Sequence, residues 1–184
     1  AVSFFIDICD KEWDMLEPLK NLERCRKIEE LSLHTKKNLN PKYDFNSKFY
    51  KMPSYLRRSA INNAAGCYSS YRSNLKNWEG NQLGRKPRLQ LDRNVMPTLY
   101  KDNMYIRTGD DTARIKIFHR NDWIWLDIRL NNQDVRYIKS HCAFKKEYVP
   151  TLKKQGKCWY LVFPFVDKVK FEDVDIQDQT ICSV

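Results

Sequence analysis

The segment from Pro53 to Glu79 constrains the fold most, because its apolar and small residues recur with a helical period. Successive members of the set are spaced four, four, three, four, four and three residues apart, which places them on one side of a helix with 3.6 residues per turn. They are Leu56, Ala60, Ala64, Cys67, Tyr71, Leu75 and Trp78. Ser54 is expected to cap the N-terminus of this helix and Gly80 to end it. The sequence therefore predicts one long helix with one packing face.

The remaining face of this helix carries hydrogen-bond donors that suit phosphate oxygens and the edges of bases. Its members are Arg57, Arg58, Asn62, Ser69, Arg72 and Lys76. We expect the four cations to act together on phosphate and Asn62 to reach a base edge. A solvated basic face on a core helix is an equal alternative, because runs of charge usually face water.

Positive charge is concentrated in the middle of the chain. Residues 41–90 hold ten Lys and Arg against two Asp and Glu, whereas residues 1–40 hold seven against eight. Seven Tyr and Phe residues are interleaved with these cations between Tyr43 and Tyr71. With a net charge of +10 and a pI of about 9.3, this distribution favours a polyanionic partner, above all nucleic acid. A membrane surface is the weaker alternative, because the packing face is built largely from Ala and Cys, which insert poorly.

The pattern as a whole predicts an α+β fold in which a small oligonucleotide-binding-like β-barrel carries an inserted helical lobe. Apolar residues at alternate positions of Ala1–Ile8 predict a strand that pairs with later strands, and Asp10 is expected to cap the helix after it. Pro18 should end that helix, and a second helix is expected over Leu19–His34. An exposed basic connector is expected over Thr35–Lys51. A plain β-sandwich is the alternative to the barrel.

From Leu89 onward the period of apolar residues changes from helical to two. The expected elements are a hairpin over Thr98–Arg107 with its turn at Lys101–Asn103, strands over Ala113–His119 and Trp123–Leu130, a short helix over Gln133–His141, and a hairpin that joins Tyr148–Leu152 to Cys158–Val166. Lys153, Lys154 and Lys157 are expected at the tip of the last hairpin. There they would hold RNA backbone or keep the strand edge soluble. Trp123, Trp125 and Trp159 are candidates for stacking on bases, although Trp at alternate strand positions is more often packed.

The six cysteines and three histidines do not form a recognisable site. The cysteines are scattered and include no CxxC pair, and His34, His119 and His141 match no zinc-ligand spacing and have no acid-base partner in the sequence. We therefore expect reduced thiols, no metal site and no catalytic residue. The longest apolar run near the start is about one strand long, so we expect neither a membrane-spanning helix nor a signal peptide, and a cytoplasmic location.

Several segments of the chain resemble TnpB proteins of bacterial insertion sequences. They are the Arg-rich helix opened by Pro53-Ser54, KPRL at 86–89, WIWLDIRL at 123–130, YIKSHC at 137–142, VPTLKKQGKCWYLVFPF at 149–165 and QTICSV at 179–184. The resemblance covers nearly the whole chain. It is carried by the order and texture of these segments, and no single catalytic signature is among them.

TnpB proteins, and the type V CRISPR effectors related to them, are RNA-guided DNA endonucleases. The resemblance implies that this chain is the N-terminal portion, with a guide RNA and a target DNA carrying a short flanking motif as its partners. The implied division is residues 1–9 as the first barrel strand, 10–84 as a helical recognition insert, 85–174 as the wedge barrel, and 175–184 as a linker and the first strand of a nuclease domain. Base pairing would read the sequence, while the protein reads backbone shape and the flanking motif. Arg57, Arg58, Asn62, Arg72 and Lys76 would then contact the heteroduplex or that motif.

The sequence departs from the family at its C-terminal end. In the family, the strand that matches Gln179–Val184 continues into Asp-Leu-Gly, whose Asp is the first carboxylate of an RNase-H-like nuclease site. This sequence stops at Val184, so Mg²⁺ is expected only in the nuclease domain that it lacks, and the chain by itself is expected not to be an enzyme. The acidic residues between Glu172 and Asp178 are expected to form a solvated loop. With Ala1 in place of Met, we expect a segment of a longer bacterial protein associated with the nucleoid.

Two other functions fit the same sequence. The chain could be a stand-alone, nuclease-dead DNA-binding repressor derived from this family, which would bind its motif in duplex DNA without RNA. It could also be a scaffold whose basic helix docks an acidic partner protein. Preference for structured RNA over other polyanions separates the first hypothesis from the scaffold.

Overall fold

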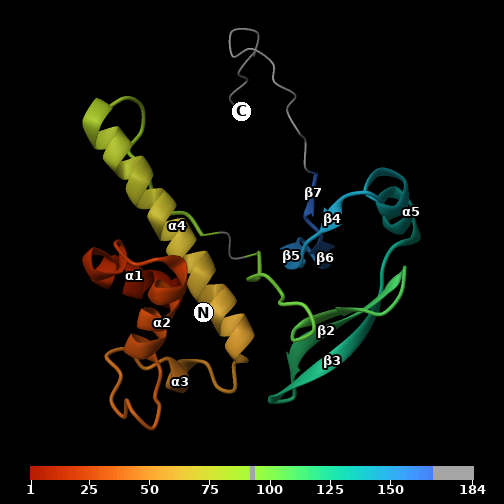
Figure 1. Cartoon of the computed structure of the whole chain (residues 1–184), viewed down its shortest axis with the longest axis horizontal. Coiled ribbons are helices and arrows are strands. Elements are labelled where there is room, and N and C mark those ends of the chain that lie inside the picture. The colour runs from red at the N-terminus through yellow and green to blue at the C-terminus, as the bar shows by residue number, and fades with distance from the viewer. Residues whose placement is uncertain (92–93, 168–184) are drawn as a thin grey trace.

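The computed structural model describes residues 1–91 and 94–167, which form an α+β fold. Four helices occupy the first half of the chain, and strands with one further helix occupy the second half. The two parts lie side by side (Figure 1). The mixed class predicted from the sequence is therefore confirmed.

The helical unit is built around one apolar core that all four of its helices share. The helices are α1 (Val2–Leu16), α2 (Asn21–Ser32), α3 (Phe45–Lys48) and α4 (Ser54–Asn81). Fully buried side chains come from each of them, including Phe5 from α1, Ile28 from α2, Phe45 from α3 and Ile61 from α4. Burial of this apolar surface is what holds the four helices together.

The strand predicted over Ala1–Ile8 is wrong, because these residues form the first half of α1. The buried residues Phe5, Cys9, Trp13 and Leu16 follow a spacing of four, four and three, so the core selects a helix rather than a strand. Alternate apolar residues over eight positions fit either period, and only the continuation to Leu16 decides between them. Residues 1–9 were predicted to form the first barrel strand, with the helices inserted after it. This prediction is wrong for the same reason, because the residues belong to α1.

Asp10 does not cap a helix, because it lies inside α1 and accepts a hydrogen bond from the Tyr68 hydroxyl of α4 at 2.9 Å. The end of α1 at Leu16, just before Pro18, is confirmed, and α2 lies within the predicted range. The connector after α2 is not simply exposed, because Phe45 is buried and its ring stacks on Phe5 at a centroid distance of 5.0 Å. The aromatic residues that we counted with the basic segment thus belong partly to the core.

The long helix is confirmed, with small corrections at its ends. Pro53 is the N-cap and Ser54 the first helical residue, whose side chain makes no capping hydrogen bond. The helix continues through Gly80 to Asn81, and it ends where Gln82 takes a left-handed conformation with φ of 51°. Gly80 is therefore not the stop, and the left-handed position that Gly usually fills is occupied by Gln82.

The second half of the chain forms three small antiparallel sheets and one helix. Its elements are β1 (Tyr105–Arg107), β2 (Thr112–His119), β3 (Asp122–Arg129), α5 (Asn132–His141), β4 (Lys146–Glu147), β5 (Thr151–Gln155), β6 (Cys158–Val162) and β7 (Phe165–Val166). The sheets have the orders β1-β2-β3, β4-β7 and β5-β6. The strands predicted for β2 and β3 and the helix predicted for α5 are confirmed.

A second apolar core joins the sheets to one another and to the helical unit. It contains Leu99, Met104 and Ile115, and Leu152 and Leu161 of the β5-β6 hairpin pack against it. Leu56 from the first turn of α4 is buried in the same cluster. The start of α4 therefore connects the two halves of the protein.

The predicted hairpin over Thr98–Arg107 is replaced by a turn followed by β1. The turn is present, with Asp102 at φ of 63°, but the residues before it pair elsewhere. The amide of Leu99 donates to the carbonyl of Pro150 at 2.9 Å, and Val95 bridges Lys153 in β5. Within the described residues the sheets remain open and do not close into one barrel.

Candidate nucleic-acid interface

The helix α4 has a buried first half and a projecting second half. Its last fully buried residue is Tyr68, and none of the residues from Ser69 to Asn81 is buried. At 1.5 Å per residue these thirteen positions extend about 20 Å beyond the core. Figure 1 shows this half of α4 running past α1 and α2 to a free end.

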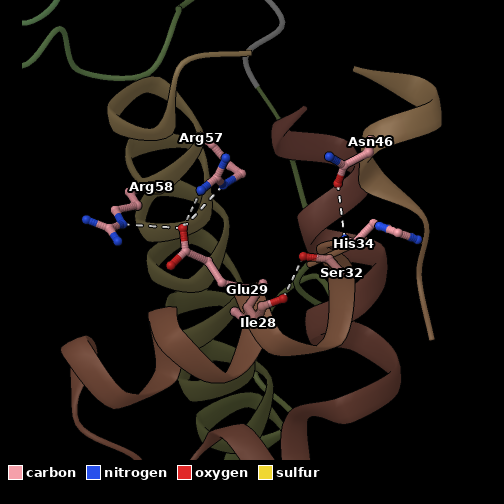
Figure 2. A network of polar contacts seen from close by, with 7 residues as sticks. All are labelled: Ile28, Glu29, Ser32, His34, Asn46, Arg57 and Arg58. Carbon is pink, nitrogen blue, oxygen red and sulfur yellow. Dashed lines mark hydrogen bonds and ion pairs between the residues drawn. The ribbon is translucent and has the colours of Figure 1, made fainter. Parts of the chain in front are cut away.

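Arg57 and Arg58 in the first half are held by a carboxylate of the protein itself. The Glu29 Oε1 atom of α2 accepts hydrogen bonds from Arg57 Nη2 at 2.9 Å and from Arg58 Nε at 3.3 Å. Figure 2 shows both guanidinium groups converging on that one oxygen. The side chains of Arg57 and Glu29 are only 17% and 13% exposed, whereas that of Arg58 is 51% exposed.

The expectation that Arg57 and Arg58 share an exposed face with Arg72 and Lys76 is thus wrong for Arg57. Consecutive residues point about 100° apart around a helix, so Arg57 turns toward α2 while Arg58 stays at the margin of the exposed face. Arg58 and Arg72 are also separated by fourteen positions, or about 21 Å along the helix axis. Two separate basic areas replace the one that the sequence predicted.

Asn62 lies on the exposed face one turn beyond Arg58. Its side chain makes no hydrogen bond to another described residue, so its amide is free to meet a ligand. The structure therefore keeps Asn62 as a candidate, but next to Arg58 rather than next to Lys76.

Arg72 and Lys76 lie on the projecting half of α4 and are exposed. Neither forms an ion pair with a described carboxylate. Arg72 lies near the hydroxyl of Tyr68, whose pKa is raised to about 12 by burial and by the hydrogen bond to Asp10, with Arg72 opposing the rise. Tyr68 therefore stays protonated and neutral, and both cations remain available to an external anion.

The chain after α4 runs back beside the helix and adds three more cations to this area. The Trp78 Nε1 atom donates to the carbonyl of Gly84 at 3.3 Å, and Lys86 Nζ lies 5.6 Å from the centroid of the Trp78 ring. Leu89 and Leu91 pack against the helical core. These contacts fix the segment at both ends, so the cations between them are held along α4.

A cavity of about 870 Å³ opens between α4 and the returning segment. Its lining consists of Tyr71, Arg85, Lys86, Pro87, Arg88, Leu89 and Gln90. It includes three cations and no carboxylate. We call this cavity the basic groove, and we call the five cations Arg72, Lys76, Arg85, Lys86 and Arg88 the distal basic surface.

Arg72 and Lys76 are expected from the sequence, whereas the three cations of the basic groove were not predicted as part of a site. The signal was present, because Arg85, Lys86 and Arg88 follow one another closely and contribute to the local charge excess. Their position next to α4 could not be predicted, because it depends on the contacts of Trp78 and Leu89. These contacts bring together residues that no helical or strand period relates in the sequence.

The predicted hairpin lysines are not all at a tip. Lys153 and Lys154 lie on β5, and the turn is made by Gly156, with φ of 60°, and Lys157. Lys154 Nζ lies 5.8 Å from the centroid of the Trp159 ring across the hairpin. None of the three pairs with a described carboxylate, but they belong to the sheet half and stand apart from the distal end of α4 (Figure 1).

The three tryptophans proposed for stacking differ in their surroundings. Trp123 packs against the second core, and Trp125, two residues further along β3, is approached by Arg114 and Lys116 at 5.7 and 5.6 Å from its ring centroid. Trp159 is 55% exposed. Only Trp159 therefore has a ring that is largely open to a ligand.

Three further features of the described residues bear on the expectations: the state of the cysteines, the grouping of possible metal ligands and the character of the helices. The five cysteines within the described ranges are free, and burial raises the pKa of Cys9 to about 12. Among residues 1–91 and 94–167, no group of three His, Cys, Asp or Glu side chains converges as metal ligands would. None of the described helices combines the length and apolar character that crossing a bilayer requires. Cys182, the acidic residues after Asp167 and the predicted final strand lie outside the described residues.

Residues 1–119 match the Aq_aa04 family, and this match includes the whole helical unit and the basic groove. The chain belongs to the Aq_aa04 family. Among its relatives is a protein of Aquifex aeolicus (strain VF5) named "Uncharacterized protein aq_aa04", which is 35% identical over 105 residues. The aligned region spans 52% of this chain and 59% of that relative. No solved structure matches the chain significantly.

Proposed function

We propose that this member of the Aq_aa04 family binds nucleic acid through the distal basic surface. The observation that carries the proposal is that five cations without a described carboxylate partner gather on the projecting half of α4 and on the segment that returns beside it. A folded protein gains nothing from holding like charges together, so an anionic ligand is the simplest reason for the arrangement. Nucleic acid fits best, because its phosphates repeat along a line as these cations do along α4.

By the resemblance to TnpB proteins, the nucleic acid would be a guide RNA and a target DNA with its flanking motif. The chain would then be the non-catalytic, N-terminal binding portion of a transposon-associated RNA-guided DNA endonuclease. The helical unit would contact nucleic acid through the distal basic surface, with Arg58 and Asn62 as a second, weaker contact. Lys153, Lys154 and Lys157 would contact RNA backbone from the sheet half.

The sheet half is proposed to be an oligonucleotide-binding-like barrel that stands open between β3 and β6. In support, residues 94–99 hydrogen-bond to β5 and lead into β1, so that β3, β2, β1, residues 94–99, β5 and β6 follow one another around the second core. An apolar cavity of about 1030 Å³ is lined by β3, β6 and α5. Hydrogen exchange tests this: amides of β2 from Ala113 to Lys116, which have partners on both sides, should be protected throughout, whereas every second amide of β3 should exchange quickly. Uniform protection of β3 would show that its outer edge is covered.

The experiment for the binding function compares fluorescence anisotropy of labelled RNA hairpin, duplex DNA and an acidic peptide with four proteins. These are the wild type, Arg72→Ala/Lys76→Ala, Arg85→Ala/Arg88→Ala, and the control Lys36→Ala/Lys37→Ala. The control removes the same charge from the exposed loop between α2 and α3, which lies at the other end of the helical unit (Figure 1). We expect both test variants to weaken binding of nucleic acid while the control stays near wild type.

Three outcomes decide among the hypotheses. Equal weakening by all three variants would mean that net charge alone matters and would overturn the proposed surface. Binding of duplex DNA with no binding of the RNA hairpin would support the stand-alone repressor. Peptide binding as tight as RNA binding would support the scaffold that docks an acidic protein.

A further inference from the structure

The basic groove has a composition that simple attraction of phosphate does not require. Besides Arg85, Lys86 and Arg88, it is lined by the ring of Tyr71 and by the amide of Gln90. Phosphate contacts need only cations and donors, whereas an aromatic ring and an amide are the groups that bind the face and the edge of a base. The groove thus offers partners for every part of a nucleotide.

Tyr71 is placed to receive a base. It is half-buried, its ring lies 5.9 Å from that of Tyr68, and it forms the helix side of the groove. A half-buried ring in contact with a second ring has less rotational freedom, so less side-chain entropy is lost when a base stacks on it. The cations of the groove come from the segment after α4, where the phosphates of the same strand would run.

A recessed ring can reach only a base that is not already stacked in a duplex. In double-stranded DNA or RNA the faces of the bases are covered by their neighbours, so exposing one costs unstacking energy. A single strand presents its bases freely, and proteins that bind single strands combine a basic groove with aromatic side chains. The groove volume of about 870 Å³ lies within the range of pockets that enclose small ligands.

We propose that the basic groove is a site for single-stranded nucleic acid, in which one base stacks on Tyr71 while Arg85, Lys86 and Arg88 hold the adjoining phosphates. This proposal rests on the proposed function, because it names the form of nucleic acid that the distal basic surface takes at this point. Gln90 lines the same groove and would hydrogen-bond the edge of the stacked base.

The test uses two single-stranded decamers that carry the same phosphates, a thymidine decamer and a decamer of abasic sites. Only the first has bases, so the ratio of the two dissociation constants isolates stacking from charge. We expect the wild type to bind the thymidine decamer about tenfold more tightly, which is the order that one stacked base supplies. In Tyr71→Leu the ratio should fall to about one, whereas Tyr71→Phe should keep it.

The ratio of the two dissociation constants stays informative even if Tyr71→Leu lowers stability, because the same fraction of the protein is folded in both titrations. Equal binding of both decamers by the wild type would overturn the stacking site and leave the proposed function standing. Binding of neither decamer, with or without bases, would contradict the proposed function as well. A ratio that is unchanged in Tyr71→Leu would place the base contact elsewhere and overturn the proposal. A decamer of glutamate that competes as well as the thymidine decamer would identify the groove as a site for acidic peptide.

Discussion

Glu29→Ala should destabilise the helical unit strongly, because it leaves a poorly exposed guanidinium without its carboxylate. Arg57 donates to Glu29 Oε1 from both Nε, at 3.2 Å, and Nη2, at 2.9 Å, and its side chain is 17% exposed. Loss of one partner of a fully buried ion pair costs about 3–5 kcal/mol, and an exposed pair contributes at most about 1 kcal/mol. The partial burial of Arg57 places Glu29→Ala between these limits, at about 2–3 kcal/mol.

Arg58 adds little to this cost, because its half-exposed side chain is already largely hydrated. Arg58→Ala should therefore cost less than about 1 kcal/mol. Glu30→Ala is a matched control, since Glu30 is the next residue of α2 and its exposed pair with Lys27 should contribute about 0.5 kcal/mol or less. The double variant Glu29→Ala/Arg57→Ala should recover part of the loss, because no unpaired charge remains.

Urea denaturation followed by circular dichroism at 222 nm measures these differences, and the slope with urea should not change. For a chain of this size the expected loss corresponds to a fall in Tm of roughly 4–12 °C. A cost for Glu29→Ala equal to that of Glu30→Ala would refute the reasoning and would return Arg57 to the set of free cations. Folded Glu29→Ala should keep the contribution of the distal basic surface to nucleic-acid binding, because Arg72 lies fourteen positions beyond Arg58 along α4.

Two further predictions concern the same unit. Gly66→Ala should stabilise the protein by about 1 kcal/mol in the same urea assay, because Gly66 lies inside α4 and a methyl group there would meet no atom within 4 Å; a loss of stability would show that the site is not open. The pKa of Glu12 is lowered by hydrogen bonds from Lys42 and Tyr43, so the stability it contributes is present above its unfolded pKa of about 4.3 and is lost as the pH falls through the lower folded pKa. Glu12→Gln should therefore reduce the free energy of unfolding at pH 7 and flatten its fall between pH 5 and 3, and an unchanged acid profile would contradict the assignment.

The parts of the fold that could be predicted are those whose residues keep one period over a long stretch. The apolar residues of α4 keep a helical period for seven turns, and those of β2 and β3 alternate over eight residues each. All three elements were therefore predicted from the sequence. Ala1–Ile8 was misassigned because a short apolar run satisfies both periods and the core of α1 extends beyond it. The long elements can therefore be predicted from the period of their own apolar residues. The short ones depend on which side chains the tertiary fold buries.

The candidate site was predicted in part, for reasons that lie in the side chains. Arg72 and Lys76 are exposed as expected, because they follow the polar face of a helix. Arg57 was misplaced because its partner Glu29 lies 28 residues earlier, and no spacing rule connects them. The basic groove was missed because the contact of Trp78 with Gly84 and the packing of Leu89 against the core bring its lining together, and no sequence period relates these residues.

The salt dependence of binding tests the central claim most directly, because each phosphate contact releases counterions and steepens the plot of log affinity against log salt concentration. Anisotropy titrations of one RNA hairpin should be made over a range of salt concentrations with the wild type, Arg85→Ala/Arg88→Ala and the control Lys36→Ala/Lys37→Ala. The account predicts that the groove variant lowers the slope by about one unit for each lost contact, close to two in all, while the control keeps the wild-type slope. A groove variant whose slope equals that of the wild type would contradict the account, because Arg85 and Arg88 would then contact no phosphate and would be solvated surface.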